Sequence, residues 1–491
     1  MARRASLLLA LACAFAASAS APAPAPAAPW SCDAGLAQRR VDAASGAYEV
    51  LVGGAAWLDG GDVAVHFGGP HGPWLALSAG SLAPAAPGAA SSGRDAVLGD
   101  FERLTVSWAA TAATAALPFP FETLFTCYTE AELVTFAQLY AAGSNGSDVS
   151  TYDDAASRPP TSFDSFNISF APTAHFPSFL SGAGSSLGSL GYVEWAGEFS
   201  WHYNSYGVGL GSNATGNDSG EEFLDGQLGG PVVLHEASAP RTAAIALGPL
   251  ALFKDVMLAR ETGGDFSPGP RLVFGPQGHL ASLPAGFAPT LGLAAPSGCA
   301  SGGATAFFPA ETGVTAAVYS FGAALRALHN TTRPAPEEDI GVSLLSVWTD
   351  NGAVYDGDFF SQPGKGGTAG TVFLELTAML ARQGIPAASM QLDPYWFATG
   401  TPGNRNWSAS LDVWGPSGFE ELLAGGVRPT LYSFFWSPAS DTTFTQFRWV
   451  DGVAETFISG VIGRIAPEDS QAFHAELMRR CRLWRCVGFE S

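Results

Sequence analysis

Two apolar runs, 342–348 and 387–393, each lead into a cluster of Trp, Asp, Asn or Tyr side chains. Between them, residues 371–383 place four apolar side chains on one face, as an amphipathic helix does: Val372, Leu376, Met379 and Leu380. A strand, a helix and a second strand in this order predict a parallel βαβ unit, whose strands end at the same edge of a sheet. Side chains at that edge are where an α/β barrel holds its active site.

The same pattern continues to the last residues of the chain. Ser417 and Glu420 are spaced as a capping box, residues 427–436 predict a third strand, and Pro467 suits the first turn of a helix. The run RCVGFES (485–491) resembles the beginning of a fourth strand. A (β/α)8 TIM barrel needs eight strands and about 250 residues. We therefore expect residues 342–491 to hold an incomplete TIM barrel of three to four βα units, and the chain to be a fragment.

Residues 31–328 follow a different pattern, that of a β-sandwich. Short runs such as FETLFTCY (121–128), PVVLHE (231–236) and TAAIAL (242–247) alternate apolar and polar residues between Gly, Pro, Ser and Asn. Period-two alternation with frequent turn residues predicts antiparallel strands packed as a sandwich. Residues 329–341 are polar, contain two prolines and predict a linker between the two domains.

The N-terminus has the pattern of a secretory signal peptide. Arg3 and Arg4 precede an apolar run, and a small-residue cleavage site follows at 17–19. We expect residues 1–19 to be removed, leaving a Pro/Ala linker at 20–30. Six Asn-x-Ser/Thr sequons agree with a secreted glycoprotein: Asn145, Asn167, Asn213, Asn217, Asn330 and Asn406. Together these features predict a secreted protein, or one held in a vacuolar or lysosome-like lumen.

Charge and cysteine content narrow the possible partners. The formal net charge is −21, and nucleic acids and anionic membranes both need a basic surface, so neither is an expected partner. No apolar stretch after the signal is long enough to insert into a membrane. No spacing among the cysteines fits a metal site and the histidines are scattered, so no zinc site is predicted. An odd number of cysteines remains after signal removal, which implies a free thiol or a partner missing from the chain: Cys32, Cys127, Cys299, Cys481 and Cys486.

Four segments carry a family resemblance. SVWTDNGAVYDGDF (346–359) and GIPAASMQLDPYWF (384–397) are the more specific, and 93–108 and 225–253 add to them. They resemble the glycoside hydrolases of the α-galactosidase and raffinose-synthase superfamily, and within it a two-domain algal and protist group. The resemblance implies a secreted glycoside hydrolase that acts on α-glycosides, on an oligosaccharide, a polysaccharide or another glycoside, by a retaining mechanism without a cofactor.

The resemblance also implies site residues. Asp393 matches an Asp that accepts hydrogen bonds from substrate hydroxyls, and Trp396 a Trp that supports the sugar ring. A carboxylate suits hydroxyl donors, and an indole face suits the C–H side of a ring. Trp348, Asp350 and Asn351 at the end of the first strand, and Trp436 at the end of the third, are also expected to face the substrate. Six side chains are thus expected to bind substrate: Trp348, Asp350, Asn351, Asp393, Trp396 and Trp436.

Other interpretations of these residues stay open. Asp350 and Asn351 precede Gly352 and could form a tight turn, Asp393 could cap the loop before a proline, and the aromatic residues could belong to the core.

The resemblance places the catalytic residues outside this chain. In the family the nucleophile lies on the fourth barrel strand and the acid/base on the sixth, whereas this sequence ends at Ser491, inside or just before the fourth. We therefore expect the catalytic residues beyond Ser491, none among residues 1–491, and no activity from this chain alone. The alternative function is a non-catalytic carbohydrate-binding glycoprotein whose β-sandwich is the binding module.

Overall fold

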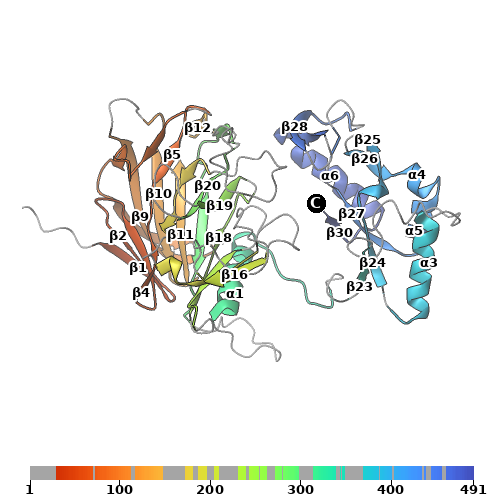
Figure 1. Cartoon of the computed structure of the whole chain (residues 1–491), viewed down its shortest axis with the longest axis horizontal. Coiled ribbons are helices and arrows are strands. Elements are labelled where there is room, and N and C mark those ends of the chain that lie inside the picture. The colour runs from red at the N-terminus through yellow and green to blue at the C-terminus, as the bar shows by residue number, and fades with distance from the viewer. Residues whose placement is uncertain are drawn as a thin grey trace, which may run out of the picture.

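The computed structural model describes twenty stretches of the chain, and all structural statements below concern these residues. They are 29–69, 72–111, 117–147, 172–180, 186–195, 204–208, 231–238, 243–253, 255–261, 271–278, 280–297, 313–338, 343, 345–348, 369–385, 387–400, 403–433, 436–437, 444–455 and 460–490. Figure 1 shows a strand-rich N-terminal body, coloured red to green, and a mixed C-terminal body, coloured blue.

The N-terminal body is built almost wholly from antiparallel strands. Its main sheet has ten strands, in the order β16-β15-β17-β18-β22-β11-β10-β9-β7 with β8 also paired to β9. These strands are β7 (Leu82–Pro84), β8 (Ala89–Asp95), β9 (Gly99–Ala110), β10 (Phe121–Tyr128), β11 (Leu133–Tyr140), β15 (Gly191–Trp195), β16 (Asn204–Val208), β17 (Val232–His235), β18 (Ala244–Pro249) and β22 (Thr290–Ala294).

Four smaller sheets accompany the main sheet. Their orders are β1-β2-β3-β4, β13-β5-β6, β14-β20-β19 and β12-β21. Their strands, with a short 3-10 turn η1 (Ser186–Gly188), are β1 (Trp30–Ala34), β2 (Ala37–Val41), β3 (Tyr48–Val52), β4 (Ala55–Asp59), β5 (Ala64–His66), β6 (Trp74–Ala76), β12 (Ser144–Asn145), β13 (Ala174–His175), β14 (Ser178–Leu180), β19 (Val256–Glu261), β20 (Arg271–Pro276) and β21 (Ser282–Leu283).

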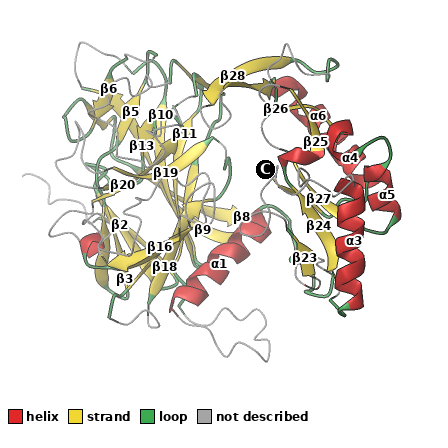
Figure 2. Cartoon of the chain, turned by 45° about the vertical axis from the view of Figure 1, so that its right-hand side comes forward, coloured by secondary structure: helices red, strands yellow, loops and turns green. Residues whose placement is uncertain are grey.

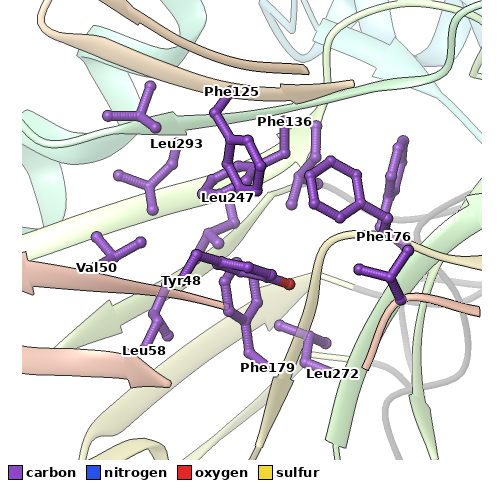
Figure 3. Close-up of a cluster of buried hydrophobic side chains, with 14 of the residues drawn as sticks. Tyr48, Val50, Leu58, Phe125, Phe136, Phe176, Phe179, Leu247, Leu272 and Leu293 are labelled. Carbon is purple, nitrogen blue, oxygen red and sulfur yellow. The ribbon is translucent and has the colours of Figure 1, made fainter. Parts of the chain in front are cut away.

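The main core of this body lies between the ten-stranded sheet and the smaller sheets. Figure 3 shows its centre, where Tyr48 of β3 lies among Phe125 of β10, Phe136 of β11, Phe176 and Phe179. The Tyr48 ring lies 5.3 to 6.0 Å from the four phenylalanine rings. Its hydroxyl donates to the Ser178 carbonyl at 2.7 Å, and the Ser178 amide donates back to it.

A disulfide and a helix complete the packing of the main sheet. The disulfide joins Cys32 of β1 to Cys127 of β10, with a Cα–Cα distance of 6.2 Å. Helix α1 (Gly313–Leu328) covers the opposite face of the sheet, where small side chains leave room for it. Strand β18 shows the alternation, because Ala244 and Ala246 face α1 while Ile245 and Leu247 face the main core.

The C-terminal body alternates strands and helices around a parallel sheet. The sheet order is β23-β24-β27-β30, and each neighbouring pair is parallel. Figure 2 shows helix α3 running beside this sheet. The elements are β23 (Leu345–Val347), α3 (Ala369–Arg382), β24 (Ala387–Leu392), η2 (Pro394–Trp396), α4 (Leu411–Trp414), α5 (Gly418–Ala424), β27 (Arg428–Tyr432), α6 (Pro467–Leu483) and β30 (Gly488–Glu490), with two hairpins, β25 (Phe397–Gly400) with β26 (Gly403–Ala409) and β28 (Trp449–Glu455) with β29 (Gly460–Ile465).

Several sequence predictions are confirmed at the level of single elements. The run 121–128 is β10 in full, 387–393 contains β24, and α6 begins at Pro467. The antiparallel strands of the N-terminal body and the parallel strand order of the C-terminal body are also as expected. The β-sandwich, the partial TIM barrel and the domain boundaries stay predictions.

Two local predictions are wrong. The capping box fails, because Ser417 makes no cap hydrogen bond and its hydroxyl donates to the Glu421 carboxylate at 2.6 Å. The apolar face of α3 is centred on buried Phe373, whereas Met379, expected to face inward, is exposed. The ring of Phe373 stacks on Trp414 at 5.8 Å, and this aromatic contact sets the rotation of the helix.

Candidate saccharide site at the ends of two parallel strands

Strands β23 and β24 have one apolar face and one polar face. Their register pairs Ser346 with Ser389 and Val347 with Met390. Met390 belongs to the buried core, and Val347 packs against it. Because side chains alternate along a strand, the residues on the other face are hydroxyl, amide, indole and carboxylate groups. They are Ser346, Trp348, Ser389, Gln391 and Asp393.

The polar face brings two of the predicted site residues into contact. The indole Nε1 of Trp348 donates to Oδ1 of Asp393 at 3.3 Å, across 45 positions of sequence. Trp348 is 44% exposed, whereas Asp393 is 5% exposed. The Asp393 carboxylate is therefore buried at the ends of β23 and β24, and the Trp348 indole beside it has a large part of its surface in solvent.

Gln391 also contacts Asp393 and is a site residue that was not predicted from the sequence. Its side-chain amide donates to the same Oδ1 at 3.2 Å. It lies two residues before Asp393 on the same strand, so period-two alternation could have identified it. One layer below, the hydroxyls of Ser346 and Ser389 are hydrogen-bonded at 2.6 Å. Such a face can bind a neutral, hydroxyl-rich ligand through a carboxylate, an amide and an indole ring.

Trp396, predicted to support a sugar ring, is fully buried. The turn η2 follows Asp393 directly, and the Trp396 amide donates to the Asp393 carbonyl at 2.9 Å. This turn directs the indole inward, where its Nε1 donates to the Tyr432 carbonyl at 2.9 Å. One ring face stacks on Phe419 at 5.7 Å. Trp396 thus presents no ring face to solvent, and the structure gives it a packing role behind Asp393.

Trp396 belongs to a cluster of large aromatic side chains. Trp407 and Trp414 are also almost fully buried, and the indole of Trp484 lies 5.5 Å from Trp407 and 5.7 Å from Trp396. The Trp407 indole donates to the same Tyr432 carbonyl as Trp396 does. This cluster forms the base on which the Asp393 turn rests.

Trp436 lies in a second aromatic group and is half-buried. Its ring is 5.0 Å from Phe473, 5.6 Å from Phe444 and 5.7 Å from Trp449. Its backbone pairs with Asn404 in an isolated bridge. The predicted contact of Trp436 with a substrate stays a prediction.

Some of the predicted residues lie outside the part of the chain that the structure describes. Asp350 and Asn351 lie outside the described residues, as do the sequon asparagines Asn167, Asn213 and Asn217.

The expected position of the catalytic residues also falls outside the described part of the chain. They are expected beyond Ser491, and Ser491 itself is not among the described residues, which end at Glu490 of β30. Strand β30 lies where the fourth strand was expected and pairs in parallel with β27. The location of a nucleophile and an acid/base beyond Ser491 stays a prediction.

Of the other sequon asparagines, Asn145 and Asn330 are exposed. Asn406 is half-buried in β26, and its side-chain oxygen accepts a hydrogen bond from the Ser408 hydroxyl at 2.7 Å. Exposure favours the first two as attachment points for a glycan.

Three further observations concern possible ligands. Within the described part of the chain, no group of three or more His, Cys, Asp and Glu side chains could hold a metal ion. None of the described helices is long and apolar enough to span a membrane. A shallow hollow of about 450 Å³ lies in the N-terminal body, lined by Trp108, Phe119 and five Ala, Leu and Pro residues between 109 and 120. It offers no charged side chain to a sugar.

Comparison with known proteins gives structural similarity alone. No family model and no curated protein matches the sequence. An α-N-acetylgalactosaminidase from Bifidobacterium bifidum aligns with 94% of this chain and 69% of its own, at 12% identity and a TM-score of 0.49. An α-galactosidase from Lactobacillus brevis aligns over 93% and 62%, at 9% identity and a TM-score of 0.47. An α-galactosidase from Geobacillus stearothermophilus aligns over 88% and 61%, at 8% identity and a TM-score of 0.43. At these values the similarity assigns no residue a role.

Proposed function

We propose that this chain is a glycoside-hydrolase-like protein that binds neutral α-glycosides at the ends of β23 and β24. The observation that carries the proposal is the contact between the exposed indole of Trp348 and the carboxylate of Asp393. The two residues come from separate polar and aromatic clusters of the sequence, and they meet at the strand edge where an α/β fold binds its ligands.

The chemistry of the edge suits a sugar. A ring laid against Trp348 would bring its hydroxyls near the Asp393 carboxylate, which Gln391 and Trp348 hold in place through Oδ1. Hydrogen bonds to a charged acceptor contribute about 1.5–3 kcal/mol each. Because the chain is strongly acidic, an uncharged ligand is favoured over an anionic one.

The proposed reaction is retaining hydrolysis of an α-glycoside, as in the family that residues 346–359 and 384–397 resemble. Such a reaction needs a nucleophilic carboxylate and a second carboxyl group about 5–5.5 Å away. We assign neither role to a residue of the described part. Asp393 is proposed to bind substrate, and the galactosides and N-acetylgalactosaminides on which the structural neighbours act are the first ligands to test.

A secretory route is part of the proposal. Its support is the Cys32–Cys127 disulfide, which forms and persists in an oxidising compartment, together with the exposed sequons at Asn145 and Asn330. Removal of N-linked glycans by an endoglycosidase should raise the electrophoretic mobility of the protein secreted from a eukaryotic cell. Unchanged mobility would contradict the glycoprotein assignment.

The binding proposal is tested by calorimetric titration of the whole chain with methyl α-galactoside and its N-acetylgalactosamine counterpart. Asp393→Asn removes the charge and keeps the shape, so at least a tenfold rise in Kd is expected for the sugar that binds. Glu421→Gln, at an exposed carboxylate of α5, is the matched control and should leave Kd unchanged. Equal affinity of the Asp393→Asn variant would contradict the site. It would favour a binding surface on the N-terminal sheets.

A further inference from the structure

The C-terminus of helix α6 brings two cysteines together. Cys481 lies in the last turn of α6, and Cys486 follows the helix, two residues before β30. The Cys486 amide donates to the Cys481 carbonyl at 2.9 Å, and the Arg485 amide donates to the Arg482 carbonyl at 3.3 Å. Arg485 has a left-handed φ of 54°. These features define a Schellman motif, in which the side chains of its first and last residues commonly touch.

In this motif the two side chains that touch are thiols. Cys481 is buried and Cys486 is half-buried, and their sulfhydryl groups are hydrogen-bonded to each other. Burial raises the pKa of both thiols, so neither is a reactive thiolate once the helix end has packed. The arrangement is therefore that of a structural pair and not of a nucleophile.

We infer that Cys481 and Cys486 form a second disulfide, which closes the end of α6. The disulfide already present supports this pairing, because a chain that acquires Cys32–Cys127 passes through an oxidising compartment. In the reaction two S–H bonds break and one S–S bond forms. The two electrons and two protons pass to an oxidised dithiol oxidoreductase of that compartment by thiol–disulfide exchange.

The disulfide has a structural consequence for the aromatic cluster behind Asp393. The closed loop contains Trp484, whose ring contacts Trp396 at 5.7 Å and Phe419 at 5.8 Å. The Val487 amide, directly after the loop, donates to the carbonyl of Pro429 in β27 at 3.0 Å. Closing the loop therefore fixes Trp484 between the helix and the parallel sheet.

This pairing also identifies which of the five cysteines has no partner among the other four. Cys32 is paired with Cys127, and pairing Cys481 with Cys486 leaves Cys299 as the one without an intramolecular partner. Cys299 alone should then react with a thiol reagent when the secreted protein is denatured without reductant.

Peptide mapping tests the inference directly. The full chain, secreted from a eukaryotic cell, is denatured with excess iodoacetamide and no reductant, and then digested with trypsin. Trypsin cleaves after Arg480, Arg482 and Arg485, so the disulfide would join the dipeptide 481–482 to the peptide that begins at Cys486. The expected result is this linked species, which separates after reduction. Carbamidomethylated Cys481 and Cys486, or a link of either to Cys299, would overturn the inference.

A stability measurement gives a second and independent test. In the Cys481→Ser/Cys486→Ser double variant the melting transition of residues 342–491 should come about 4 to 9 °C lower than in the parent chain, because a six-residue loop is no longer closed in the unfolded state. A reducing agent able to open this bond should remove most of the difference. Cys299→Ser is the control and should melt with the parent. Equal melting of the double variant and the parent under oxidising conditions would contradict a disulfide at this position.

Discussion

Replacing Trp348 with Ala removes the exposed ring of the candidate site and keeps the strand that carries it. The side chain is 44% exposed, and because a whole Trp offers roughly 250 Å², about 110 Å² of it faces solvent. A pyranose ring that covered about half of this area would gain about 1.4 kcal/mol, at about 25 cal/mol per Å². The Ala variant should therefore bind a neutral α-glycoside about tenfold more weakly.

Trp348→Phe separates the ring from its hydrogen bond. This variant keeps an aromatic face and loses the Nε1 donor to Asp393, a partly exposed bond of 3.3 Å. Because the bond is present with and without ligand, its loss acts on affinity only through the position of the ring. Such a bond contributes about 0.5–1 kcal/mol, so Kd should rise by at most about two- to fivefold, less than for Ala.

The assay is calorimetric titration of the parent and both variants with methyl α-galactoside. Tyr319→Ala, at an aromatic residue of α1 that is 38% exposed, is the control. Thermal unfolding shows that each variant is folded. A Trp348→Ala variant with the parent's affinity, or a control that loses as much affinity, would refute the assignment of this ring to the site.

Two further predictions concern stability. Tyr48→Phe should cost about 1–3 kcal/mol in unfolding free energy, because the buried Ser178 amide loses its acceptor. The Ser178 carbonyl loses one of two donors and keeps the Gly61 amide at 2.6 Å. An unchanged denaturant midpoint would contradict this prediction. The pKa of Glu476 is lowered to about 2, chiefly by hydrogen bonds from Arg479 and then from Arg480. The ionised Glu476 therefore contributes to the free energy of unfolding above pH 4.5, its ordinary pKa, and this contribution is lost as the pH falls towards 2. Glu476→Gln should destabilise the protein by about 1 kcal/mol or less at pH 7, because the Arg479 side chain is more than half exposed and solvent screens its charge. The variant should melt with the parent near pH 2. A deficit that is independent of pH would contradict the assignment.

The elements predicted best from the sequence are those that a single strong local signal defines. The run 121–128 alternates along its length and became β10, and the proline at 467 opened α6 where its ring is compatible with the first turn. The rotation of α3 was missed, because it depends on Phe373 meeting Trp414, a contact across 41 positions of sequence.

The candidate site was predicted in part for the same reason. Trp348 and Asp393 were found because each ends a strand, and parallel strands end at one edge. The motif Asp393-Pro-Tyr-Trp-Phe does not reveal which of its rings turns inward. The turn η2 decides this, and it buries Trp396 against Phe419. Likewise, no sequence rule pairs Cys32 with Cys127, since their strands meet only in the folded sheets.

A crystal structure of the chain with a bound neutral α-glycoside tests the central claim most directly. We expect a sugar ring against the indole of Trp348, with a hydroxyl about 2.5–3.2 Å from the carboxylate of Asp393. A sugar bound on the N-terminal sheets, with the strand edge at Trp348 and Asp393 empty, would contradict it.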